Sequence, residues 1–139
     1  MTTVTELLTA ARSWIGVKYL HQGRSRFGVD CIGFPIAVLK ELDVLPKKFV
    51  DYRTYGRHPD GEMQPIVEQY CERITAPIPG SLVLMQWPKT KGAGHAAIVT
   101  GKTIIHAFQR SGTVVEVGFR GAWLKSLHSS WRLPGVTYE

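Results

Sequence analysis

The spacing of apolar residues changes along this chain from a helical to a strand pattern, and the change falls at residues 76–80. Before this point, apolar residues recur every three or four positions, as on one face of an α-helix. The segment 76–80, Ala-Pro-Ile-Pro-Gly, interrupts regular structure because proline lacks an amide donor and glycine favours turns. After it, short apolar runs are typical of strands. The order predicts an α+β fold with N-terminal helices packed on a C-terminal antiparallel sheet.

The pattern also predicts where individual elements lie. Residues 3–6 form a capping box that begins the first helix, and Gly16 is the expected C-terminal cap. Pro35 predicts that the second helix begins regularly only near residue 32 or 33, or else has a distorted first turn. The expected helices cover residues 3–14, 31–42, 62–74 and 122–127, with an ordered surface loop at 46–61. The expected strands cover residues 82–86, 95–100, 103–108, 114–117 and 130–133.

Length and charge limit the classes of function. The 139 residues fit a single domain over 1–139, and the net charge of +6 suits a polyanionic partner. Nucleic acid, an anionic membrane or a phosphate-bearing cell-wall polymer would each fit. The basic residues are scattered, without an arginine-rich helix or an aromatic RNA-binding motif, so we do not expect a nucleic-acid partner. No apolar run is long enough to span a membrane, and residues 1–15 do not resemble a secretory signal.

Cys31 is the candidate nucleophile. It lies between a glycine-containing loop and the apolar run that predicts the second helix. Unpaired amides and the positive end of the dipole at a helix N-terminus favour the thiolate, and the same amides can bind an oxyanion. The alternative is that Cys31 is a small buried apolar residue. Cys71 lies in a separate apolar stretch and is expected to be a free, buried thiol.

Two histidines are expected to lie on one face of the sheet. Gly101-Lys102 fits a two-residue type II′ hairpin, in which the numbers of opposed residues sum to 203. His95 and His106 then become diagonal neighbours, roughly 7–8 Å apart between backbones. A shift of one residue in register would separate them.

A cysteine and two histidines are what thiol catalysis requires. Taken singly, each histidine is more simply explained as a hydrogen-bonded core or surface imidazole. A Cys/His/His zinc site is a third possibility, although structural zinc usually takes four ligands. The remaining histidines, His21, His58 and His128, are expected to be surface or loop residues.

Four segments resemble the NlpC family of cell-wall cysteine peptidases. Residues 16–33 contain Gly-Val-Lys-Tyr, then Gly23, then Asp-Cys-Ile-Gly, similar to a family segment in which a tyrosine and a glycine-containing loop precede Asp-Cys-Ser-Gly. Residues 79–83 resemble its Pro-Gly-Asp-Leu segment. Residues 94–99 resemble the strand with the general base, and residues 104–107 the strand with the third polar residue. The matches follow the family order and cover about residues 4–134.

The resemblance implies a papain-like fold and cleavage of peptide bonds in the peptidoglycan stem, often next to D-glutamate and diaminopimelate. It makes Cys31 the nucleophile, His95 the base and His106 the residue that orients the base. Tyr19 would line the site near the oxyanion, or would be an ordinary packed aromatic residue. Asp30 would be structural, as a helix-capping carboxylate. No cofactor and no metal ion are implied.

The chain departs from the family pattern at three positions. Ile32 replaces the family serine, Pro35 interrupts the helix start, and Ser81 replaces the usual aspartate. Ile32 and Ser81 are both expected beside the cleft, Ile32 as a substrate or oxyanion contact and Ser81 as a structural residue.

Residues 119–135 also resemble versions of the family in phage tails. This implies a virion-associated protein, or one delivered to the cell envelope without a signal peptide after cytoplasmic synthesis. Stem peptides and phage tail proteins would be its partners, and a bacterial origin also remains open. Two other functions remain open. One is an acyltransferase or transglutaminase-like enzyme, and the other is a non-catalytic component of a tail tip.

Overall fold

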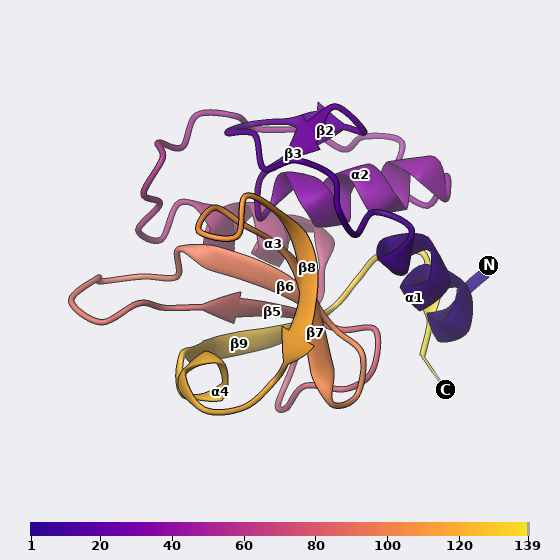
Figure 1. The fold of residues 1–139 in the computed structure, drawn as a ribbon. Coiled ribbons are helices and arrows are strands. Elements are labelled where there is room, and N and C mark those ends of the chain that lie inside the picture. The colour runs from indigo at the N-terminus through magenta and orange to yellow at the C-terminus, as the bar shows by residue number, and fades with distance from the viewer. Residues whose placement is uncertain (139) are drawn as a thin grey trace.

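A six-stranded antiparallel sheet forms the C-terminal part of the chain in the computed structural model, which describes residues 1–138 (Figure 1). The strand order is β4-β9-β5-β6-β7-β8. The bounds in this order are Glu72–Ile74, Leu127–Arg132, Leu82–Met85, His95–Val99, Thr103–Phe108 and Thr113–Gly118. The fold class is therefore the expected one, with the helices first and the sheet after them.

Helices cover one face of this sheet. Helices α1 (Val4–Arg12), α2 (Gly33–Glu41) and α3 (Met63–Tyr70) contribute Leu7, Phe34 and Met63 to a core that includes Leu84 and Ile98 of the sheet. On the other face, a smaller cluster around Val83 and Ile104 packs beneath α4 (Ala122–Lys125) and its flanks (Figure 1). Side chains alternate between the two faces along a strand. His95 is two residues from Ala97 on β6, and His106 is two residues from Ile104 on β7, so both histidines lie on this second face.

Within residues 1–138, two short strand pairs that the sequence did not predict lie outside the six-stranded sheet. Strand β1 (Thr2–Thr3) pairs in parallel with β10 (Val136–Thr137), so the two ends of the chain lie side by side (Figure 1). Strand β2 (Arg24–Ser25) pairs with β3 (Gly28–Val29) in the loop before Cys31.

The first helix begins as predicted and ends earlier. Thr3 accepts a hydrogen bond from the Glu6 amide, and the Glu6 carboxylate accepts one from the Thr3 amide, which confirms the capping box. The C-cap is Ser13, so the prediction of Gly16 as the cap was wrong. Gly16, with a φ of 95°, instead turns the chain towards the sheet, and its amide donates to the Val114 carbonyl.

The next two helices are both shorter than predicted. Helix α2 begins at Gly33, so Pro35 is its third residue, where an amide would have no partner inside the helix. Cys31 accordingly lies in the turn before the helix and not in its first turn. Helix α3 ends at Tyr70, because residues 72–74 form β4 and pair with β9.

The β6–β7 hairpin has the predicted register and a different turn. Ile98 faces Ile105 and Val99 faces Ile104, so the opposed numbers sum to 203. Gly101 lacks the positive φ that a type II′ turn requires. The hydroxyls of Thr100 and Thr103, 2.6 Å apart, bind each other across the turn instead.

Candidate active site

Cys31 lies in the turn between β3 and α2, where Asp30 fixes the backbone. The Asp30 carboxylate accepts a hydrogen bond of 2.8 Å from the Gly33 amide, and the Asp30 carbonyl accepts one of 2.9 Å from the Phe34 amide. The Cys31 side chain is 5% exposed and within hydrogen-bonding reach of the Ala96 amide. Because Ala96 follows His95 directly, the sulfur lies against the first residues of β6.

The thiol of Cys31 is less acidic than a free cysteine, which corrects the expectation from its helix-start position. Burial, and then the negative charge of Asp30, raise the pKa of Cys31 to about 12. The backbone amides of Ala96, Ile32 and Cys31 do favour the thiolate, as expected of amides at a helix start, and burial outweighs them. The free protein therefore holds a neutral thiol at pH 7.

His95 and His106 form a direct hydrogen bond. Nε2 of His95 lies 2.6 Å from Nδ1 of His106, and the two side chains are 5% and 0% exposed. The hairpin register thus brings the two imidazoles together, as the sequence predicted. With Nε2 of His95 engaged by His106, Nδ1 is the nitrogen left to exchange a proton with a thiol.

Both imidazoles are held in the neutral form. Burial, followed by the neighbouring His106, lowers the pKa of His95 well below its usual value. Burial alone lowers the pKa of His106 to about 4. Nε2 of His106 is buried without a hydrogen-bond partner among residues 1–138, so nothing offsets the desolvation that a charged ring would suffer.

Three aromatic side chains surround the imidazole pair. Phe108 stacks on His106 at a centroid distance of 5.3 Å, and Trp123 meets His106 edge-on at 4.7 Å. Trp87 lies 5.3 Å from His95. Phe108 could have been placed from its sequence, since it is two residues after His106 on the same face of β7. Trp87 comes from the loop after β5 and Trp123 from α4, and the spacing of apolar residues in the sequence does not predict that either would lie beside the histidines.

Asp30 is the centre of a buried polar network. Arg24 Nη1 donates to Asp30 Oδ1 at 3.1 Å, and the Tyr55 hydroxyl donates to Oδ2 at 2.6 Å. The Gln22 amide donates to Oδ2 at 2.7 Å. Arg24 also binds the Asp51 carboxylate and, at 2.8 Å, the Tyr55 hydroxyl. Asp30 is therefore a structural anchor for the turn that carries Cys31.

Residues 53–61 connect the cysteine side of the site to the histidine side. At one end, the Gln22 side chain donates to the carbonyls of Arg53 and Tyr55. At the other, Asp60 accepts hydrogen bonds from the amides of Lys91 and Gly92, in the loop that leads to His95. The predicted surface loop is ordered, and it buries Tyr55 to 4% exposure. We call residues 53–61 the bridging segment.

Of the three other predicted site residues, Tyr19 lies beside Cys31, Ile32 contributes only its backbone, and Ser81 lies away from the histidines. Tyr19 is half-buried close to Cys31, and burial, with the charges of Cys31 and Asp30, raises the pKa of its phenol. Ile32 turns its side chain into the apolar core at 3% exposure, so it offers the site only its backbone amide. Ser81 lies away from the histidines, because its carbonyl pairs with Val99, roughly 13 Å along β6 from His95. Its hydroxyl closes a turn with Ile78.

The other candidate residues lie apart from this arrangement. His58 is exposed, His21 packs edge-on against Tyr55, and His128 contacts Ser129. Cys71 is free and half-buried. Within residues 1–138, no group of three or more His, Cys, Asp and Glu side chains is placed to hold a metal ion, and no helix is long and apolar enough to cross a membrane.

A protein-family model matches the part of the chain that contains the site residues described above. Residues 16–132 match the model of the NlpC/P60 family. The chain belongs to the NlpC/P60 family. The match includes Cys31, His95 and His106, and no curated protein matches the chain with significance.

Solved structures with this fold include three NlpC/P60 proteins. A family protein from Bacillus cereus is 20% identical with a TM-score of 0.71, over 94% of this chain and 40% of its own. The NlpC/p60 domain of the peptidoglycan hydrolase SagA is 18% identical with a TM-score of 0.63, over 94% and 98%. RipD from Mycobacterium tuberculosis, a non-catalytic NlpC/p60 protein adapted to peptidoglycan binding, is 12% identical with a TM-score of 0.59, over 93% and 95%. These likenesses show the papain-like NlpC/P60 fold, and this chain spans two fifths of the Bacillus cereus protein.

Proposed function

We propose that this NlpC/P60 protein hydrolyses peptide bonds in peptidoglycan stem peptides through an acyl-enzyme on Cys31. The observation that carries the proposal is the 2.6 Å pair of His95 and His106, with the sulfur of Cys31 against the amide of the residue that follows His95. The membership of the chain in a family that includes peptidoglycan hydrolases supports a cell-wall substrate.

The residues have complementary roles in the proposed reaction. As the Cys31 sulfur attacks the amide carbonyl, its proton passes to Nδ1 of His95, while Nε2–H of His95 donates to Nδ1 of His106. The backbone amides at residues 31 and 32 and the Tyr19 hydroxyl stabilise the oxyanion. The C–N bond then breaks, and His95 gives the proton to the leaving amine. Water, deprotonated by His95, attacks the thioester and releases the carboxylic acid and the Cys31 thiol.

The test is digestion of purified muropeptides, with the products identified by mass spectrometry. Wild type is expected to release peptide fragments, and Cys31→Ala to lose about four orders of magnitude in rate or more. Cys71→Ala is the matched control, because it removes the other thiol and leaves the nucleophile in place. A wild type no faster than Cys31→Ala would refute the proposal. Products joined to an added amine in preference to water would instead identify an acyltransferase.

One observation favours a second candidate, a non-catalytic peptidoglycan-binding protein. The Cys31 thiol is buried, and its pKa is raised to about 12, which is unlike a resting thiolate nucleophile. RipD shows that the NlpC/P60 fold occurs without catalysis. In this case the chain would sediment with insoluble peptidoglycan and would release no fragments from it.

The proposed place of action is a phage tail, from which the chain would reach the cell wall. The support is the resemblance of residues 119–135 to phage versions of the family. Mass spectrometry of purified virions from the source strain tests it, and virions that lack the chain would contradict it.

A further inference from the structure

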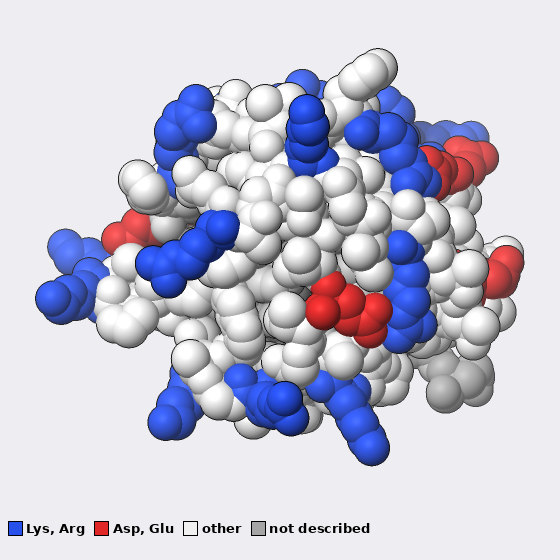
Figure 2. Space-filling view, viewed as in Figure 1, with Lys and Arg blue, Asp and Glu red and all other residues white. Residues whose placement is uncertain are grey.

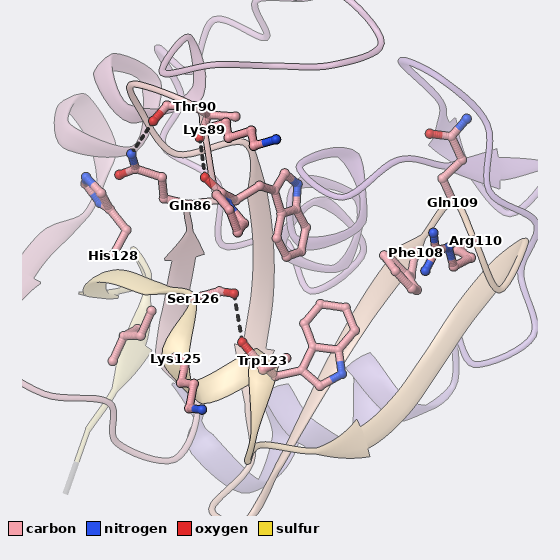
Figure 3. A pocket seen from close by; sticks show the side chains of 14 residues that line it. Gln86, Lys89, Thr90, Phe108, Gln109, Arg110, Trp123, Lys125, Ser126 and His128 are labelled. Carbon is pink, nitrogen blue, oxygen red and sulfur yellow. Dashed lines mark hydrogen bonds between the residues drawn. The ribbon is translucent and has the colours of Figure 1, made fainter.

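A groove of about 1320 Å³ is lined by residues that include Trp123 and Leu127, which pack on the sheet face opposite helices α1 to α3. Figure 3 shows the side chains that line it. Its walls come from the loop after β5, the turn after β7 and the segment 122–128 around α4. This volume exceeds the roughly 300–1,000 Å³ of a typical small-molecule pocket. The groove therefore has room for several units of a chain-like ligand.

The groove combines aromatic surface with positive charge. Trp87, Phe108 and Trp123 line the groove and are half-buried against the imidazole pair, so part of each side chain faces the groove. Figure 3 labels Phe108 and Trp123. Part-exposed aromatic rings of this kind can stack on the apolar faces of sugar rings. The part of each ring that faces the groove is therefore available for such stacking.

Three exposed cations line the same groove: Lys89, Arg110 and Lys125. Among the lining residues within 1–138, none is Asp or Glu, so nothing in the wall neutralises them. Elsewhere, basic and acidic side chains both occur on the surface, as the visible face in Figure 2 shows. The charge of the groove therefore complements an anionic ligand.

The loop that carries Lys89 is held in place before any ligand binds. Lys89 has a φ of 71°, in the left-handed region that non-glycine residues rarely adopt. The Thr90 hydroxyl donates to the Trp87 carbonyl at 2.8 Å, and the Gln86 side chain donates to the Thr90 carbonyl at 2.8 Å (Figure 3). A preordered loop loses less backbone conformational freedom on binding.

We propose that this groove binds a phosphate-bearing saccharide polymer, with sugar rings on the aromatic side chains and phosphates on the three cations. The groove adjoins the imidazole pair, because its lining residues Trp87 and Trp123 contact His95, and none of its lining residues belongs to the Cys31 turn. The choice of a saccharide polymer over other polyanions rests on the proposed action at the cell wall. The groove would hold the protein on the wall beside its substrate.

The test measures binding by isothermal titration calorimetry with full-length Cys31→Ala protein, so that no probe is cleaved. The probe is glucosylated poly(glycerol phosphate). Polyphosphate supplies the charge without sugar, chito-oligosaccharide supplies sugar without charge, and oligo(dT) represents nucleic acid. The saccharide phosphate is expected to bind at least about tenfold more tightly than each of these, and more weakly at high salt.

Two triple variants distinguish the contribution of the groove cations to binding from that of the overall net charge. The triple variant Lys89→Gln, Arg110→Gln, Lys125→Gln is expected to bind the saccharide phosphate about tenfold more weakly, since it removes three exposed charge contacts.

The matched control is Lys47→Gln, Lys48→Gln, Lys102→Gln, which removes the same charge from exposed positions outside the groove. It is expected to bind within about twofold of the parent. Equal losses in the two variants would overturn the proposal, as would polyphosphate or oligo(dT) binding as tightly as the saccharide phosphate. A protein that binds the polymer but releases no muropeptide fragments would refute the hydrolase and leave the groove assignment standing.

Discussion

The burial of His106 predicts a specific loss of stability in acid. The pKa of this imidazole is about 4 in the folded protein, against about 6.5 in an unfolded chain. Above pH 6.5 the ring is neutral in both states, and its contribution to stability is fully present. As the pH falls from 6.5 to 4, the unfolded chain binds a proton that the folded protein does not, so stability is lost.

The magnitude follows from the difference between the two pKa values. It is 6.5 − 4 = 2.5, which at about 1.36 kcal/mol per pKa unit gives about 3 kcal/mol. A His106→Asn variant lacks this titration, although its amide can still accept the hydrogen bond from His95. The advantage of wild type over His106→Asn in free energy of unfolding should therefore shrink by about 3 kcal/mol between about pH 7.5 and pH 4.

Urea unfolding of the two proteins at four or five pH values measures this change. Carboxylates that titrate in the same range are present in both proteins and cancel in the difference. His58→Asn, which removes an exposed imidazole, is the matched control. If the stabilities of wild type and His106→Asn fall in parallel with pH, the ring is not held neutral by burial and the reasoning is refuted.

Two further predictions concern the cysteine turn and its anchor. In a Cys71→Ser background, the rate of Cys31 alkylation by iodoacetamide should keep rising above about pH 9, because burial raises the thiol pKa to about 12; a plateau at about pH 6–7 would contradict this. Tyr55→Phe removes the 2.6 Å hydrogen bond to the buried Asp30 carboxylate and should lower the free energy of unfolding by about 2 kcal/mol in urea. Tyr52→Phe, at a side chain 43% exposed, should change it by less than about 0.5 kcal/mol, and equal effects would argue against the network.

The imidazole pair could be predicted from the sequence because its determinants are local. A two-residue loop and the alternation of side chains along a strand fix which residues share a face. Even with a different turn at Gly101, the loop length kept the register, and His95 met His106. The capping box at Thr3 is local in the same sense.

The acidity of Cys31 could not be predicted in this way. The argument from a helix start considers only the nearest amides, which do favour the thiolate. Burial depends on β6 and on the packing of distant segments around the turn. Tyr55, which donates a hydrogen bond to Asp30, lies 25 residues away. Its loop has no regular spacing of apolar residues from which the contact could be predicted. The end of α3 has a similar cause, since Ile74 fits a helical spacing and yet pairs with Ser130 of β9.

The two candidate functions differ in what must happen to one proton. In the free protein, burial holds both the Cys31 thiol and the His95 imidazole neutral, so a resting thiolate–imidazolium pair is disfavoured. A hydrolase built this way must transfer the proton as the sulfur attacks, with the new charge on a carbonyl oxygen held by backbone amides. Muropeptide cleavage without an alkylation plateau near neutral pH would identify this concerted route. A protein that shows neither muropeptide cleavage nor an alkylation plateau, and that sediments with insoluble peptidoglycan, would be a binding protein. The buried Cys31 thiol would then have only a packing role.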